Sequence, residues 1–201
     1  MDMGVADEYG GDMKSIHKWP VLLMLWPLFT ACATTLKPAD WNFEKNAVRI
    51  HIKADNQLNL FNGKAHTLYI CFYQLAELNA FDQLTQDASG IRRLLECRLF
   101  DDSVASANSR VIHAGENITV MLDRSEQARY LAIVAGYSTE LTDARMVRRH
   151  KFQTYKKRES LFKQKYRCIP CPAAIELSLG PNQIEHSKTL QSELKCSDEC
   201  E

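Results

Sequence analysis

Four cysteines near the end of the chain carry its clearest potential for chemistry. They form two close pairs, Cys168-x2-Cys171 and Cys196-x3-Cys200. Two such pairs of thiolates can bind zinc as a tetrahedral site. In an oxidising compartment the same residues form disulfides instead. The amino-terminal segment bears on this choice, because it indicates the compartment.

The segment 13–32 has the order of a secretory signal. A basic start is followed by a nearly continuous apolar run over 21–29 and then by small residues before Cys32. At about 1.5 Å per residue, the whole apolar run over 19–31 is too short to cross roughly 30 Å of hydrocarbon as a helix. We expect residues 1–31 to be a signal peptide. Its true start is expected at Met13, because the residues before it form an acidic leader that a signal does not need.

Small residues directly before a cysteine resemble the lipobox of bacterial lipoproteins, in which the cysteine is acylated and becomes the first residue. The resemblance implies a covalent lipid on Cys32, although Phe29 stands where such boxes usually carry Leu, Val or Ile. Ala33 follows the cysteine, whereas an Asp there would hold such a lipoprotein at the inner membrane. We therefore expect a lipid-anchored protein on the periplasmic face of the outer membrane. The alternative is a buried core helix that ends in an ordinary cysteine.

Export to an oxidising compartment favours disulfides over zinc. We expect at least one disulfide among the four terminal cysteines, with a zinc site as the alternative. Cys71 lies in a strand-like run and Cys97 at the end of a helix-like one. Both are expected to be buried as small apolar residues.

Catalytic signatures are missing from the sequence, which has no G-x-S-x-G, P-loop, H-E-x-x-H or G-x-G-x-x-G pattern. We expect no enzyme, no small-molecule substrate and no cofactor beyond the covalent lipid. The segment 145–167 holds ten lysines and arginines against Glu159 alone. Such a run can bind nucleic acid, but an exported protein seldom meets it. We expect a solvated face or an exposed loop there, with anionic lipid or an acidic partner as alternatives.

Hydrophobic periodicity predicts many short strands. Apolar and polar residues alternate over 48–54, as in a strand with one wet face, and both faces are apolar over 66–75 and 130–137. Shorter strands are expected at 110–113, 118–123 and 175–179, and helical spacing at 76–84 and 91–98.

These elements predict a mostly β protein, a two-sheet β-sandwich with a short helical insertion. We place the sandwich at 47–180, after a lipidated tether at 32–46 and before a polar, cysteine-containing tail at 181–201. No structure is predicted for 138–167.

Several stretches, in this order, resemble the TssJ/VasD family of type VI secretion system outer-membrane lipoproteins. They are 51–75, 100–116, 122–137 and 173–184, and the strongest match is DRSEQARYLAIVAGY at 123–137. The resemblance implies a transthyretin-like two-sheet sandwich that is acylated at Cys32. It also implies binding to the periplasmic domain of the inner-membrane subunit TssM, which fixes the envelope-spanning complex. The segment 138–167 and the tail depart from the family pattern.

The loop at 55–65 is the expected partner surface, since by resemblance it is the loop that TssJ proteins present to TssM. It holds three large apolar residues among polar ones, and such a loop normally stays in water. If these three apolar residues point outward, they are apolar anchors within a polar rim. The alternative is that they fold back over an open end of the sandwich. The expected binding residues are Asn56, Leu58, Asn59, Leu60, Phe61 and Lys64. A rival function is a periplasmic carrier of a small ligand or peptide, for which an enclosed pocket would be the sign.

Overall fold

The structure, a computed structural model, describes residues 35–159, 165–190, 196 and 200. The expected signal peptide at 1–31 and the expected lipidation site Cys32 lie outside these residues. The chain from Thr34 onward forms one compact unit. Within the described residues, no helix combines the length and the apolarity that crossing a membrane requires.

The described residues form eleven strands and three short helices. The strands are β1 (Thr35–Lys37), β2 (Glu44–Ala54), β3 (Leu68–Leu75), β4 (Val104–Ile112), β5 (Asn117–Arg124), β6 (Tyr130–Ala135), β7 (Val147–Lys151), β8 (Thr154–Arg158), β9 (Lys165–Pro170), β10 (Ala173–Leu179) and β11 (Ile184–Leu190). The helices are α1 (Asn79–Leu84), α2 (Ala88–Leu94) and α3 (Asp143–Met146).

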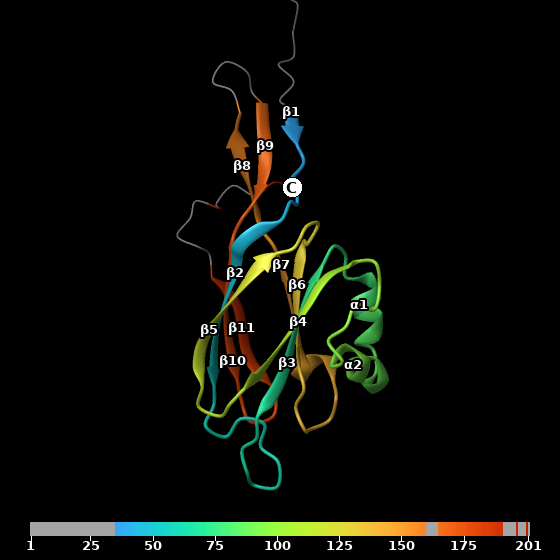
Figure 1. Ribbon diagram of the computed structural model, residues 1–201, viewed down its shortest axis with the longest axis vertical. Coiled ribbons are helices and arrows are strands. Elements are labelled where there is room, and N and C mark those ends of the chain that lie inside the picture. The colour runs from blue at the N-terminus through green and yellow to red at the C-terminus, as the bar shows by residue number, and fades with distance from the viewer. Residues whose placement is uncertain (1–34, 160–164, 191–195, 197–199, 201) are drawn as a thin grey trace, which may run out of the picture. The chain divides into compact units, whose positions relative to one another are not determined.

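Two four-stranded sheets face each other, one ordered β11-β10-β2-β5 and the other β4-β3-β6-β7. A third sheet, β1-β9-β8, lies beyond one end of them (Figure 1). Strand β10 runs parallel to β2, and the other neighbours within the two large sheets are antiparallel. The expected mostly β, two-sheet sandwich with a short helical insertion is therefore confirmed.

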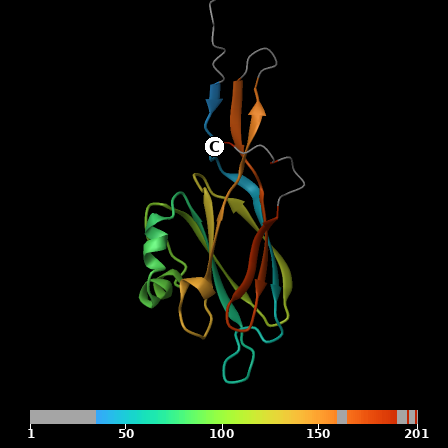
Figure 2. The ribbon, with the colours of Figure 1, turned by 180° about the vertical axis from the view of Figure 1, so that it is seen from behind.

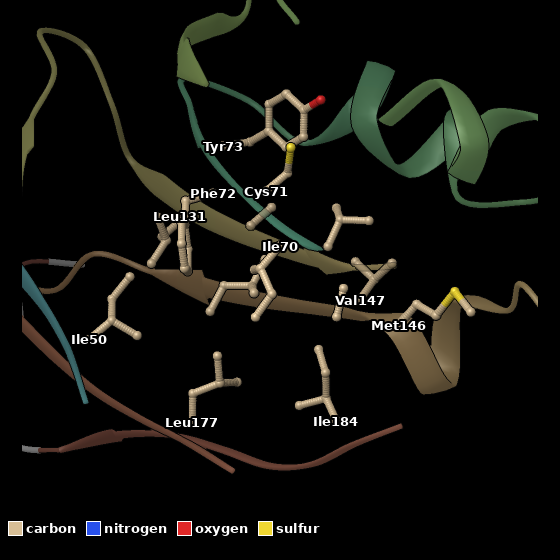
Figure 3. Packing of buried hydrophobic residues seen from close by; sticks show 14 of the residues in the cluster. Ile50, Ile70, Cys71, Phe72, Tyr73, Leu131, Met146, Val147, Leu177 and Ile184 are labelled. Carbon is tan, nitrogen blue, oxygen red and sulfur yellow. The ribbon is translucent and has the colours of Figure 1, made fainter. Parts of the chain in front are cut away.

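The core between the large sheets follows from the alternation in the strands. On β2, Ile50 and Ile52 are fully buried while Arg49 and Lys53 are exposed. Figure 3 shows Ile50 among the side chains that fill the space between the sheets. Burial of apolar surface at about 25 cal/mol per Å² is the main stabilising contribution here.

The central strand β3 is apolar on both faces because the helices cover its outer side. Tyr73 points away from the facing sheet, donates a hydrogen bond to the Leu94 carbonyl at 2.5 Å and packs edge-on against Phe81 at 6.0 Å. Its burial raises the pKa of Tyr73 to about 12. The expected helical segments at 76–84 and 91–98 are therefore a cover for this sheet.

Cys71 also faces the helices and is buried as expected, but the prediction of it as a separate small apolar residue is wrong. It forms a disulfide with Cys97, with an S–S distance of 2.02 Å. Helix α2 ends just before Cys97, whose φ of 55° turns the chain back beside β3. This turn brings together two cysteines that the sequence places in different elements.

The segment without a predicted structure, 138–167, contains α3, β7, β8 and the start of β9. The basic residues of β7 contact other parts of the protein in place of water, so the hydropathy of this segment does not indicate a strand. Arg149 pairs with Asp82 at 2.6 Å and Asp143 at 2.7 Å, and Arg148 donates to the Ile184 carbonyl. The expected solvated face is therefore wrong for this part of the basic run.

The expected boundaries of the sandwich were also too narrow. The polar tail at 181–201 contains the edge strand β11, and the tether at 32–46 contains β1 and the start of β2. An edge strand has one unpaired side and commonly carries polar residues. In β11 only Ile184 is fully buried, so its hydropathy does not distinguish it from a solvated tail.

His150 joins the two large sheets along the side where β7 and β11 meet. Its Nδ1 lies 2.9 Å from Thr189 Oγ1, and its Nε2 lies 2.7 Å from Ser187 Oγ. Burial, assisted by the positive charge of Arg148, lowers the pKa of His150 to about 4. The folded protein therefore holds a neutral imidazole well below the ordinary His pKa of about 6.5.

Acid should weaken the fold through His150. Between pH 6.5 and 4 the unfolded chain binds a proton at this residue and the folded protein does not. The contribution of the neutral His150 side chain to the free energy of unfolding is complete above pH 6.5 and is lost as the pH falls toward 4. We expect about 1–2 kcal/mol of it to be lost by pH 5. The free energy of unfolding is measured in urea at pH 7.5 and at pH 5. Its decrease between the two should be smaller for His150→Gln than for His113→Gln, a control at an exposed position. Equal decreases would contradict this assignment.

Candidate functional site

The candidate site is the long loop that joins β2 to β3, at the end of the sandwich where β2 and β10 finish (Figure 1). Its base is fixed to neighbouring chain segments by backbone hydrogen bonds. The amide of Asp55 donates to the Leu179 carbonyl at 2.8 Å, and the amide of Leu60 donates to the Pro181 carbonyl at 2.8 Å. The Asp55 carbonyl accepts from the amide of Gly115 at 3.0 Å. The base of the loop is therefore part of the folded body.

Two of the expected binding residues belong to this base, and their assignment as exposed contacts is wrong. Leu58 is 0% exposed and lies in the hydrophobic core, and Asn59 is 5% exposed. Asn59 adopts a left-handed backbone conformation, with φ at 48°. Its side chain donates to the Thr67 carbonyl at 2.9 Å and accepts from the Ser138 amide at 2.8 Å. This bend turns the chain back, so Leu58 closes the end of the sandwich.

The tip of the loop is a tight hairpin at 61–64. The amides and carbonyls of Phe61 and Lys64 exchange two hydrogen bonds, at 2.9 and 3.1 Å. Between them, Asn62 and Gly63 both have positive φ, at 50° and 72°, as a type I′ turn requires. A Cβ on Gly63 would meet no atom within 4 Å, so the turn stands clear of the body.

Phe61 is presented outward on this hairpin. Its side chain is 49% exposed, although it is a large apolar residue. The ring of His66 lies edge-on against it at a centroid distance of 6.2 Å. His66 Nδ1 in turn lies 3.0 Å from the Lys64 carbonyl oxygen. Phe61 is thus held on a short, hydrogen-bonded turn and remains open to a partner.

The other expected contacts lie in the same loop as Phe61. Lys64 and Asn56 are exposed, and Leu60 is half-buried at the junction of tip and base. His66 was missed by sequence reasoning, because the loop was taken to end before it. We define the tip surface as Leu60, Phe61, Asn62, Lys64 and His66. It combines the exposed Phe61 and the half-buried Leu60 with three polar neighbours, the composition typical of the centre and rim of a protein interface.

The sandwich offers little support for a carrier of small ligands. The surface hollows formed by described residues include three that are open to solvent and lie outside the space between the large sheets. The first holds Arg149, whose guanidinium is already paired with Asp82 and Asp143. Between the sheets, the buried apolar side chains pack as one cluster.

Metal chemistry also lacks a site within the described part of the chain, where no group of three or more potential ligands is found. The structure joins Cys168 to Cys200, with an S–S distance of 2.17 Å, and Cys171 to Cys196, at 2.09 Å. Sulfur atoms in disulfides are not thiolates, so they do not ligate zinc. These two bridges tie Cys200 to β9 and Cys196 to the short connection between β9 and β10.

Comparison with known proteins places the chain beside secretion-system lipoproteins. The family model described as "Type VI secretion lipoprotein, VasD, EvfM, TssJ, VC_A0113" matches residues 46–167. The crystal structure of the T6SS lipoprotein TssJ1 from Pseudomonas aeruginosa is similar, with 18% identity, a TM-score of 0.53 and coverage of 75% of this chain and 98% of that chain. A chain from a structure described as "Type VI membrane complex" has 14% identity, a TM-score of 0.50 and coverage of 71% and 96%. At these identities the structural likeness shows the fold alone. No curated protein sequence matches this chain.

Proposed function

Because this chain belongs to the type VI secretion lipoprotein family, we propose that it binds the periplasmic domain of the inner-membrane subunit TssM. In this proposal the chain is the outer-membrane-anchored, periplasmic component of the membrane complex. It acts by holding TssM in place, without catalysis.

The observation that carries the proposal is the exposed Phe61 on a hydrogen-bonded turn. A few well-packed anchors supply most of the binding free energy of a protein interface. An aromatic side chain whose backbone is already fixed loses little conformational entropy on binding. The tip surface therefore suits a docking role better than a catalytic one.

The anchor completes the proposal. In this proposal residues 1–31 are removed and Cys32 is acylated. The described domain then lies in the periplasm and is attached to the outer membrane through its amino terminus. One acyl chain gives only marginal membrane binding, whereas the several chains of a bacterial lipoprotein give a stable hold. The domain is thus tethered to one membrane and binds a subunit of the other.

Co-purification tests the partnership. The full chain, extracted from membranes in detergent, is mixed with a tagged TssM periplasmic domain from the same organism. We expect the two to elute together from an affinity column and then from a sizing column. Failure to co-elute, with a chain whose circular dichroism and thermal transition show a folded protein, would overturn the proposal.

Substitution of Cys32 tests the anchor separately. Cys32→Ser should leave the protein unprocessed or released from the outer membrane, because no thiol remains to accept the lipid, while the domain still folds. Thr34→Ser, a conservative change two residues away, should keep both anchoring and lipid. Fatty-acid labelling and membrane fractionation measure the two outcomes, and persistent labelling of Cys32→Ser would exclude this acylation site.

A further inference from the structure

The small sheet β1-β9-β8 carries an excess of positive charge. None of the residues in its three strands is acidic. Its cations are Lys37, Lys156, Lys157, Arg158, Lys165 and Arg167. Two carboxylates pair with part of this set. Glu159 lies 2.6 Å from Arg167, 3.5 Å from Lys165 and 3.9 Å from Lys37, and Asp40 lies 3.3 Å from Arg167.

The strand register places like charges opposite one another. Arg167 on β9 pairs with Lys37 on one side and with Lys157 on the other. Paired residues share a face of a sheet, so three cations form a row across it. Like charges in directly opposite positions are destabilising. Glu159 and Asp40 offset this repulsion in part, and the remaining positive charge favours an anionic surface that faces the sheet.

The position of this sheet indicates which surface that is. Strands β8 and β9 extend β7 and β10 past the end of the sandwich where β2 and β10 begin, opposite to the loop that carries Phe61 (Figure 2). Strand β1 begins at Thr35, three residues after Cys32. Three residues span at most about 11 Å, whatever their conformation. An acyl chain on Cys32 therefore holds β1 close to the lipid headgroups.

This proximity matters because charge acts over a short range. At physiological ionic strength the screening length is about 8 Å, so a basic sheet contributes to membrane binding only when it is held near the surface. Lys156 and Lys157 are both exposed on the edge strand β8. They can approach headgroup phosphates without breaking a strand pairing.

We propose that the sheet β1-β9-β8 docks on anionic phospholipid headgroups beside the lipid anchor. This inference rests on the proposed acylation of Cys32. Contact through the sheet, in addition to the flexible acyl linkage, fixes the orientation of the domain. The loop that carries Phe61 lies at the opposite end of the sandwich from this sheet, so the contact leaves that loop open to a partner from the inner membrane.

Amide hydrogen exchange on vesicles tests the proposal. The acylated full chain is incorporated into vesicles of phosphatidylcholine alone or with one-third phosphatidylglycerol. We expect exchange in β8 to be roughly fivefold slower with the anionic lipid, and this difference to disappear at high salt. The double variant Lys156→Gln/Lys157→Gln should lose the difference. Arg49→Gln/Lys53→Gln, which removes two exposed cations from β2, should keep it.

The proposal would be overturned if β8 exchanged equally in both kinds of vesicle. It would also be overturned if both double variants lost the lipid-dependent difference in exchange to the same extent. TssM is absent from this measurement, so its result is independent of the proposed partnership. The mass of the isolated chain shows whether Cys32 is acylated. An unacylated chain would overturn the proposed anchor and this docking with it, whereas an acylated chain with equal exchange in both kinds of vesicle would overturn the docking alone.

Discussion

Replacing Leu58 by alanine should lower the free energy of unfolding by about 3 kcal/mol and leave TssM binding within about twofold of the wild type. Leu58 is fully buried in the core cluster. The truncation removes several buried methyl and methylene groups, and the surrounding backbone is held by the hydrogen bonds of the loop base, so the cavity cannot collapse freely. The tip hairpin has its own backbone hydrogen bonds and remains formed.

Urea unfolding and a binding titration measure the two effects on the same protein. Leu99→Ala is the matched control, since Leu99 is 65% exposed and its truncation should change stability by less than about 0.5 kcal/mol. A stable Leu58→Ala protein that no longer binds TssM would contradict the structure and return Leu58 to the interface.

Replacing Phe61 by alanine should have the opposite profile. We expect the dissociation constant for TssM to rise roughly thirtyfold, which corresponds to about 2 kcal/mol. Phe61 is half exposed in the free protein, and its backbone pairing with Lys64 does not depend on its side chain. Stability should therefore change by less than about 0.5 kcal/mol.

Phe43→Ala is the control for this variant. Phe43 is also a large exposed aromatic residue, at 61%, and it immediately precedes β2, at the opposite end of that strand from the loop. Its truncation should leave TssM binding unchanged. Equal losses of binding in both variants would point to general surface hydrophobicity, and a large loss of stability in Phe61→Ala would place that residue in the core.

Much of the fold could be predicted from the sequence because its strands alternate clearly. The alternation at 48–54 and the two-sided apolar runs at 66–75 and 130–137 gave the central strands, and the family resemblance is confirmed by the match over 46–167. Strand β7 was missed, since Arg149 pairs with Asp82 from a distant part of the chain and with the nearby Asp143. Hydropathy cannot reveal such tertiary pairing.

The sequence indicates the loop of the proposed site but not which of its residues are exposed. The turn at Asn62-Gly63 is a local signal that the sequence carries. The left-handed Asn59 depends on partners at Thr67 and Ser138, so the inward turn of Leu58 could not be predicted locally. The disulfide between Cys71 and Cys97 escaped prediction for the same reason, because it needs the helices to fold back over β3.

Site-specific photocrosslinking tests the docking of the tip surface on TssM most directly. A photoreactive phenylalanine analogue is placed at position 61 or, as the control, at position 43, and the full chain is irradiated with the TssM periplasmic domain. We predict a strong crosslink to TssM from position 61 and none from position 43. A crosslink from position 43 with none from position 61 would contradict the proposed interface.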